Sequence, residues 1–125
     1  MNVLLDSDIV IEVLRARDQA VLSKWAALIA SKADILFSPV TAAEVWEGAR
    51  PREQQAIVSC FSLLHCAEID YPTGQLAGTL LRQYRGSHGL EIADALIAAT
   101  AVQQQAALWT RNPKHYPMPQ LSFYS

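Results

Sequence analysis

The chain has 125 residues, of which 51% are hydrophobic and 18% are charged, and its formal net charge is −2. This length suits one domain with a real core, and the composition excludes an intrinsically disordered chain. The charge excludes a broadly basic nucleic-acid coat protein, but it allows a local basic rim around an acidic pocket. No repeat, Gly/Ser linker or low-complexity tract divides the chain, so we expect a single domain over residues 1–125.

Apolar periodicity predicts short strands that alternate with helices. Apolar runs predict strands over 3–5, 35–37, 64–69 and 107–110, and an additional edge strand over 121–124. Helical spacing predicts helices over 9–17, 19–32, 41–49, 53–63, 73–84 and 91–105, with a flexible break at 86–89. Such alternation is typical of a parallel sheet with helices on both faces.

Neither a membrane span nor a secretion signal is expected. No stretch approaches the ~20 uncharged apolar residues of a transmembrane helix, and the N-terminus lacks a cationic segment and is interrupted by Asp6 and Asp8. Cys60 and Cys66 match no zinc-ligand spacing, and we expect both to be reduced thiols. We therefore predict a cytoplasmic protein without structural zinc.

Three acidic side chains lie close to the ends of predicted elements. Asp6 ends the first strand, Glu44 follows the second strand by one helical turn, and Asp94 lies in the first turn of an apolar helix. Ligands of parallel α/β sheets bind beyond the carboxyl ends of the strands. We therefore expect these three carboxylates to meet at one edge of the sheet.

Each of these acids also has a simpler interpretation. Asp6 could cap the helix that follows it, although Ser7 and Asp8 are equally good caps. Glu44 could be a solvated helix acid, and Asp94 could be tolerated by the positive end of its helix dipole. Against this, Asp94 lies in an apolar helix and has no basic partner at helical spacing.

Three acids that meet at one place imply a bound cation. Two like charges about 4 Å apart repel by about 4 kcal/mol at an effective dielectric constant of about 20. Such carboxyls have raised pKa values or require a positive ion, and hard oxygen ligands suit Mg²⁺ or Mn²⁺. The chemistry that follows is metal-assisted hydrolysis of a phosphodiester.

Four segments of the chain together resemble the PIN-domain ribonucleases, and specifically the toxins of VapBC-type toxin–antitoxin pairs. These segments are Leu4–Ile11, Ser38–Glu44, Ile92–Ala101 and Trp109–Tyr116. The resemblance spans almost the whole chain, in order. It implies a three-layer α/β/α fold around a mainly parallel sheet of four to five strands, and an acidic Mg²⁺ or Mn²⁺ site that cleaves RNA.

The resemblance also implies roles for individual residues. By this likeness Asp6, Glu44 and Asp94 are catalytic and hold the metal, and Ser7 supports them. The fourth catalytic position of the family is often an Asp, and here it is Asn112. Asn112 can form hydrogen bonds but adds no charge. By the same likeness, Glu91 could compensate for the lost charge. His115 stands at a position where some relatives carry an acid.

An acidic site on an acidic protein needs local basic residues to bind RNA. The candidates for phosphate contacts are Arg82, Arg85, Arg111 and Lys114. Relatives of this kind usually form homodimers and are blocked by an antitoxin that lies across the active site. The antitoxin surface would include apolar helix residues that the sequence alone does not separate from the core: Trp25, Leu28 and Trp46.

Two other functions stay open at this point. A PIN-like fold that has lost catalysis and only binds RNA or protein is supported by Asn112 alone. A phosphotransfer enzyme of the haloacid-dehalogenase type would use Asp6 as the nucleophile and Asp8 as the general acid. That fold usually needs a longer chain, a lysine after a middle strand and a late acidic pair, and none of these is evident.

Overall fold

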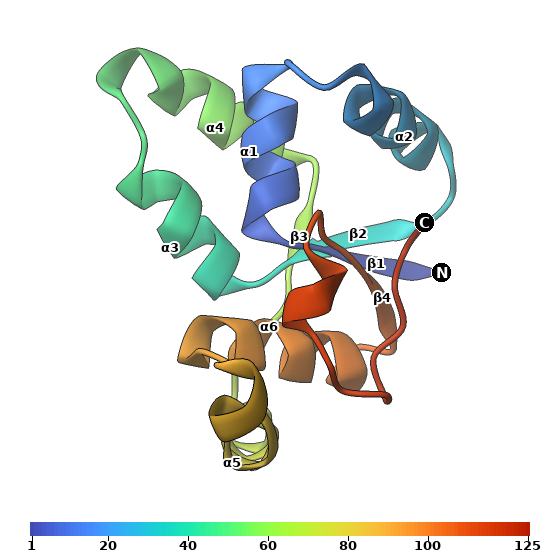
Figure 1. Ribbon diagram of the computed structural model, residues 1–125. Helices are drawn as coiled ribbons and strands as arrows, with labels where there is room; N and C mark the ends of the chain where they lie inside the picture. Colours follow the sequence, from blue (N-terminus) through green and yellow to red (C-terminus); the bar gives the residue numbers. More distant parts are fainter.

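A four-stranded parallel sheet runs through the middle of the protein in the computed structural model, which describes residues 1–125 (Figure 1). The strands stand in the order β3-β2-β1-β4, and each neighbouring pair is parallel. Their bounds are Asn2–Leu5 for β1, Asp34–Phe37 for β2, His65–Cys66 for β3 and Ala106–Trp109 for β4.

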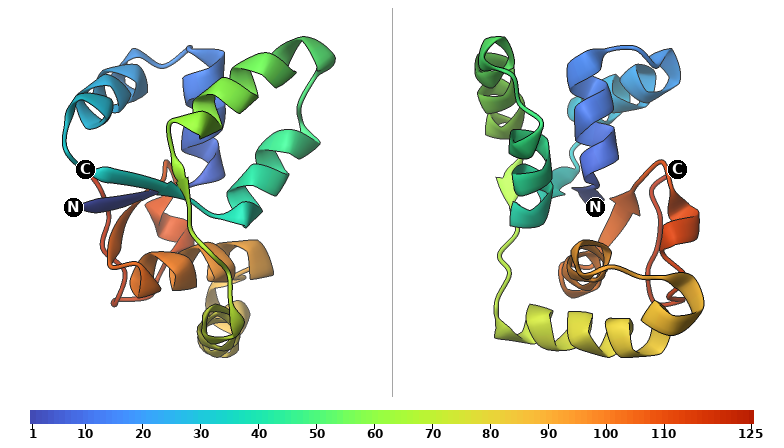
Figure 2. Two further views of the ribbon diagram at one scale, coloured as in Figure 1. Left: turned by 180° about the vertical axis from the view of Figure 1, so that it is seen from behind. Right: turned by 60° about the vertical axis from the view of Figure 1, so that its left-hand side comes forward.

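The six α-helices form two layers, one on each face of the sheet, which confirms the predicted three-layer α/β/α fold. Their bounds are Ser7–Arg15 (α1), Gln19–Ala30 (α2), Pro39–Glu47 (α3), Gln54–Ser62 (α4), Tyr71–His88 (α5) and Ile92–Gln103 (α6). Helix α6 covers one face with α5 packed on its outer side, α1, α2 and α4 cover the other face, and α3 lies beside α1 (Figures 1 and 2). None of the helices combines the length and apolar character that crossing a membrane requires.

The core has two halves because successive strand side chains point to opposite faces of the sheet. Leu4 and Leu108 pack with α5 and α6 on one face. Val3, Leu5 and Trp109 pack with α1, α2 and α4 on the other. The apolar runs of the strands therefore reflect burial on both sides, as expected for a parallel sheet.

The predicted edge strand over 121–124 is wrong. This segment forms only an isolated bridge between Leu108 and Phe123, with hydrogen bonds from the Leu108 N–H to Ser122 and from the Tyr124 N–H to Leu108. Leu121 is nevertheless buried, so the apolar pattern reported burial and not strand pairing. The sheet therefore has four strands.

Most element bounds differ from the prediction by a few residues, the third strand is only His65–Cys66 where 64–69 was predicted, and two helix ends differ in an informative way. The expected break at 86–89 is helical through His88, and α5 ends at Gly89, whose φ of 62° forms a left-handed cap. Helix α1 runs from Ser7 to Arg15 and ends at Ala16, which also adopts a left-handed conformation, with φ 54° and ψ 40°. Glycine is the usual residue at such a cap, so an alanine there carries a conformational cost.

The topology brings three helix-starting segments to one edge of the sheet. The chain leaves β1 at Asp6 and enters α1, leaves β2 through Ser38 into α3, and leaves β4 toward a short 3₁₀ helix over Pro113–His115. Helix α6 begins beside the same edge and contacts α3 (Figure 1). This edge is the carboxyl end of the strands, where ligands of α/β proteins bind.

Candidate active site

Asp6 is the most deeply held acid of the site. It is 8% exposed, and it caps α1 by accepting the Ser7 N–H at Oδ1, 2.8 Å away. Its other oxygen, Oδ2, accepts the Thr110 hydroxyl at 2.9 Å and the Tyr116 hydroxyl at 2.8 Å. Asp6 therefore caps α1, and it also accepts hydrogen bonds from two residues that follow β4, so capping is not its only role.

The negative charges of the three predicted acids act on one another. Burial raises the pKa of Glu44, and the charges of Asp6 and Asp94 raise it further, against a hydrogen bond from the Ser7 hydroxyl. Burial also raises the pKa of Asp94, again with the charge of Asp6, while the nearby His115 opposes this. The structure thus brings Asp6, Glu44 and Asp94 within electrostatic range of one another, from β1, α3 and α6.

Asp8 is a fourth acid of this cluster, although the sequence alone indicates for it only a helix cap or a dehalogenase-type general acid. Its Oδ2 accepts the Arg111 N–H at 3.0 Å and the Asn112 side-chain amide at 3.2 Å. Its Oδ1 is buried without a hydrogen-bond partner. Burial, and then the charge of Asp6, raise the pKa of Asp8. Asp8 thereby fixes the loop after β4 to the start of α1.

Thr110 and Tyr116 also belong to the site, and the sequence alone does not indicate either of them. Thr110 lies two residues before the predicted Asn112, and its hydroxyl is 2.9 Å from Asp6 Oδ2 and 3.4 Å from Asp8 Oδ2. Tyr116 is 4% exposed. A buried tyrosine hydroxyl usually finds a partner, but the sequence does not indicate that the partner lies 110 positions away in Asp6.

The remaining predicted site residues lie around this cluster. The Ser7 N–H donates to Asp6, and the Ser7 hydroxyl lowers the pKa of Glu44, so Ser7 lies next to both acids. Glu91 is exposed at the start of α6, and its charge is one of those that raise the pKa of Asp94. Asn112 is exposed and its amide is bound to Asp8, so it lies next to the acids without touching Asp6 directly.

The donor set fits a hard divalent cation that keeps water ligands. Every oxygen donor is a carboxylate, and none of Asp6, Glu44 or Asp94 forms an ion pair with Arg or Lys. No three His, Cys, Asp or Glu side chains are close enough to enclose an ion by themselves. Mg²⁺ commonly binds through one or two carboxylates and completes its shell with water, so an open arrangement suits it.

Arg111, one of the predicted RNA contacts, is engaged inside the protein. Its guanidinium pairs with Glu12, Nη1 to Oε2 at 3.2 Å, and with Asp18, Nη2 to Oδ2 at 3.2 Å. The other predicted contacts are exposed and form no ion pair: Arg82, Arg85 and Lys114. These three keep their charges available to solvent.

A hollow of about 240 Å³ adjoins the acids on the α6 side. Its lining combines two imidazoles with two carboxylates and the turn between α5 and α6: His88, Gly89, Leu90, Glu91, Asp94 and His115. Arg85 borders the adjacent depression over the same turn. The acidic site therefore opens toward a surface that carries basic and imidazole groups.

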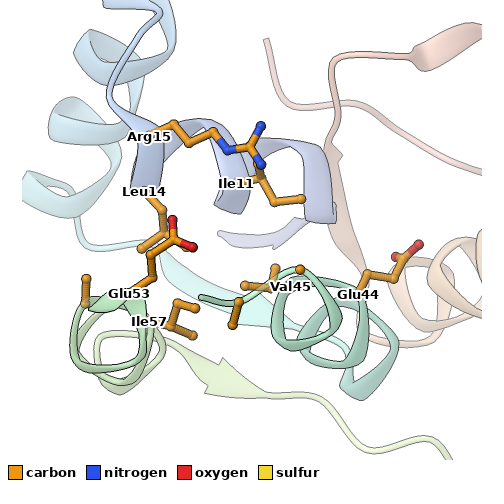
Figure 3. Close-up of a pocket in the computed structure, with 10 residues that line it drawn as sticks. Ile11, Leu14, Arg15, Glu44, Val45, Glu53 and Ile57 are labelled. Carbon is orange, nitrogen blue, oxygen red and sulfur yellow. The ribbon is translucent and has the colours of Figure 1, made fainter. Parts of the chain in front are cut away.

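A small apolar pocket of about 80 Å³ adjoins the acids on the α3 side. It lies between α1, α3 and α4, and Figure 3 shows Glu44 and Glu53 at its two ends with Val45 and Ile57 between them. Of the apolar residues considered for a partner surface, Trp46 is 40% exposed, but Leu28 is 1% exposed and belongs to the core. Trp25 is half-buried against the same core.

Comparison with known proteins assigns the family. The PIN domain family model matches residues 3–119. Ribonuclease VapC19 of Mycobacterium tuberculosis is 34% identical over 116 residues, which cover 92% of each protein. Ribonuclease VapC10 of the same species is 32% identical over 121 residues, which cover 93% of this chain and 86% of that protein.

Solved structures agree with this assignment at the level of the fold. A chain in the crystal structure of VapBC2 from Rickettsia felis, bound to a DNA fragment from its promoter, matches with a TM-score of 0.80. The identity is 24%, and the match covers 99% of this chain and 98% of that one. The chain therefore belongs to the PIN-domain family and, within it, to the VapC-type ribonucleases.

Proposed function

We propose that this protein is a divalent-metal-dependent endoribonuclease and the toxin of a type II toxin–antitoxin module. The observation that carries the proposal is the juxtaposition of Asp6, Glu44 and Asp94 at the carboxyl edge of the sheet without any paired cation. Burial, and then the charges of neighbouring acids, raise the pKa values of Glu44 and Asp94, and a divalent cation would relieve this cost of ionisation. The ribonuclease names of the relatives supply the substrate class.

In this proposal one or two of the carboxylates of Asp6, Glu44 and Asp94 bind Mg²⁺ or Mn²⁺ directly and the rest bind it through water, and Ser7 supports Asp6 and Glu44. A bound divalent ion would offset the phosphate charge and lower the pKa of the attacking water. Asp6 stays fixed at the end of β1 because three hydrogen bonds hold its carboxylate. Asn112, held by Asp8, is placed to donate or accept a hydrogen bond at the rim without adding charge.

RNA would approach over the hollow that Asp94 shares with His88 and His115. Arg85 and Lys114 are exposed and lie close in sequence to residues that line this hollow, so they can contact phosphates. Arg82 extends this basic surface along α5, whereas Arg111 has carboxylate partners already.

The test is cleavage of an end-labelled RNA by the purified protein with Mg²⁺ or Mn²⁺, with and without EDTA. Cleavage should require the ion and fall at least about 100-fold in Asp6→Asn and Asp94→Asn. The matched control is Asp34→Asn, because Asp34 starts β2 at the amino end of the strands, away from the acids. Unchanged cleavage by Asp94→Asn in nuclease-free preparations would contradict the assignment.

The same experiment separates the proposal from a binding-only PIN domain. RNA that binds at physiological salt without being cleaved, with either ion, would favour the catalytically impaired, RNA-binding module that Asn112 suggests.

We also infer an antitoxin partner, since the structural relatives include toxin–antitoxin complexes. The pocket between Glu44 and Glu53 is the surface that we assign to it, because it borders the acids and is mostly apolar. The homodimer and the cytoplasmic location stay predictions.

A further inference from the structure

Tyr116 donates its hydroxyl to the acid at the centre of the site. The distance from its Oη to Asp6 Oδ2 is 2.8 Å, and both residues are buried. Its ring packs in the core half that contains Leu4 and Leu108, and its backbone N–H donates to the Pro113 carbonyl. The hydroxyl is therefore aimed by packing on one side and by the 3₁₀ turn on the other.

The hydrogen bonds to Asp6 leave it one free acceptor position. A carboxylate has about four lone-pair directions, two on each oxygen. On Oδ2 the hydroxyls of Thr110 and Tyr116 occupy both, and on Oδ1 the Ser7 N–H occupies one. Only Oδ1 therefore has a lone pair left for a cation.

Of the two donors to Oδ2, Tyr116 is the dedicated one. The Thr110 hydroxyl has a single proton and lies within reach of both Asp6, at 2.9 Å, and Asp8, at 3.4 Å. The Tyr116 hydroxyl has no second acceptor in the structure. A carboxylate oxygen can only accept, so the hydroxyl of Tyr116 is the donor of this bond.

We propose that Tyr116 is a positioning residue that fixes Asp6 and confines its metal contact to the single oxygen Oδ1. The inference rests on the proposed metal-dependent function and adds to it the element that sets the orientation of the first ligand. Hydrogen bonds to the ligands of a metal commonly change its affinity or the activity by about 10- to 100-fold. Without this donor, Asp6 could rotate and Oδ2 would become free.

The test is Tyr116→Phe, which keeps the ring and removes the hydroxyl. Mn²⁺ affinity is measured without RNA, by the electron paramagnetic resonance signal of the free ion, and kcat and KM are measured at saturating Mn²⁺. We expect Mn²⁺ to bind about 10-fold more weakly and kcat to fall, with KM for RNA within about twofold of the wild type. The matched control is Tyr124→Phe, a half-buried tyrosine that packs on Trp109 and whose hydroxyl forms no hydrogen bond within the protein.

The outcomes separate this inference from the proposed function. If the wild type binds Mn²⁺ and Tyr116→Phe binds it equally well, the positioning role is overturned and the nuclease assignment stands. If the wild type binds no Mn²⁺, the proposed function fails and this inference fails with it. Should the variant not fold, NMR of the wild type decides: we expect the buried, hydrogen-bonded Tyr116 hydroxyl proton to give a resonance that shifts on addition of Mg²⁺, and an unmoved resonance overturns the inference.

Discussion

Arg111 and Glu12 form an ion pair, Nη1 to Oε2 at 3.2 Å, in which the Glu12 side chain is only 5% exposed. Arg17 is the second partner of Glu12, also at 3.2 Å, but its own side chain is 65% exposed. Arg111 therefore joins the loop after β4 to α1 and, through Asp18, to the start of α2. We interpret it first as a structural clamp.

Substitution of Arg111 should affect the stability of the fold more strongly than it affects RNA binding. Arg111→Ala leaves the buried Glu12 carboxylate with one exposed partner, at a cost of about 2 kcal/mol of unfolding free energy. For a domain of this size that corresponds to a fall in Tm of roughly 8 °C, measured by thermal denaturation. Lys114→Ala, on the same loop without an ion pair, should change stability by less than about 0.5 kcal/mol. A raised KM for RNA with an unchanged Tm would instead support the RNA contact expected from the sequence.

The acid cluster predicts how the metal-free protein responds to pH. The pKa values of Asp8, Glu44 and Asp94 are raised from ordinary values of 3.8, 4.5 and 3.8, chiefly by burial. A carboxyl whose pKa is raised by folding favours the folded state below its unfolded pKa, and this contribution is lost as pH rises through the folded value. From about pH 4 upward, these groups should therefore progressively destabilise the protein in EDTA.

This effect can be isolated with Asp94→Asn. The difference in Tm between this variant and the wild type, measured in EDTA, should be close to zero near pH 4 and become positive toward pH 8. Saturating Mn²⁺ should reverse the order, because the ion stabilises only the protein that binds it well. Asp34→Asn, at the far edge of the sheet, is the control. An Asp94→Asn protein that is less stable than the wild type at neutral pH in EDTA would contradict the electrostatic argument.

The sequence was sufficient for the acids that follow strand ends but not for the residues that orient them. Asp6, Glu44 and Asp94 could be grouped because parallel topology places strand ends together, whatever the side-chain detail. Tyr116 and Thr110 reach Asp6 across separations of 110 and 104 positions. Local periodicity carries no information on such contacts.

Two errors show the same limit. The apolar segment 121–124 reads as a strand, yet it is buried by packing with a single bridge to β4. Arg111 reads as a free cation beside Asn112, yet it pairs with Glu12 and Asp18. Composition and spacing reveal that a residue is apolar or charged, but only the tertiary arrangement determines what covers or pairs it.

The pocket between α1, α3 and α4 should be separable from catalysis. Ala56 lines it and is exposed, so Ala56→Arg fills the pocket without disturbing the core. We expect this variant to cleave RNA at the wild-type rate and to escape inhibition by an antitoxin encoded next to its gene, measured by cleavage with increasing antitoxin. Gln55→Arg adds the same charge on α4 outside the pocket lining and should remain inhibited. Equal inhibition of both variants would place the antitoxin elsewhere.

The left-handed cap of α1 predicts a stabilising substitution. Ala16 has φ 54°, and its N–H donates to the Glu12 carbonyl at 2.8 Å, so the backbone is fixed in a conformation that a Cβ disfavours. Ala16→Gly removes this conflict and keeps the hydrogen bond. The unfolding free energy should rise by about 0.5–1 kcal/mol, measured by urea denaturation, even though glycine also gains entropy in the unfolded chain.

The matched control is the same substitution in an ordinary helical position. Ala26 is exposed within α2, where Ala26→Gly should lower stability by about 1 kcal/mol because glycine has poor helix propensity. Opposite signs for the two substitutions would assign the effect to backbone conformation and not to loss of a methyl group. RNA cleavage should be unchanged in Ala16→Gly, since Ala16 lies at the end of α1 away from Asp6. A destabilised Ala16→Gly would show that the unfolded-state entropy of glycine outweighs the strain at this cap.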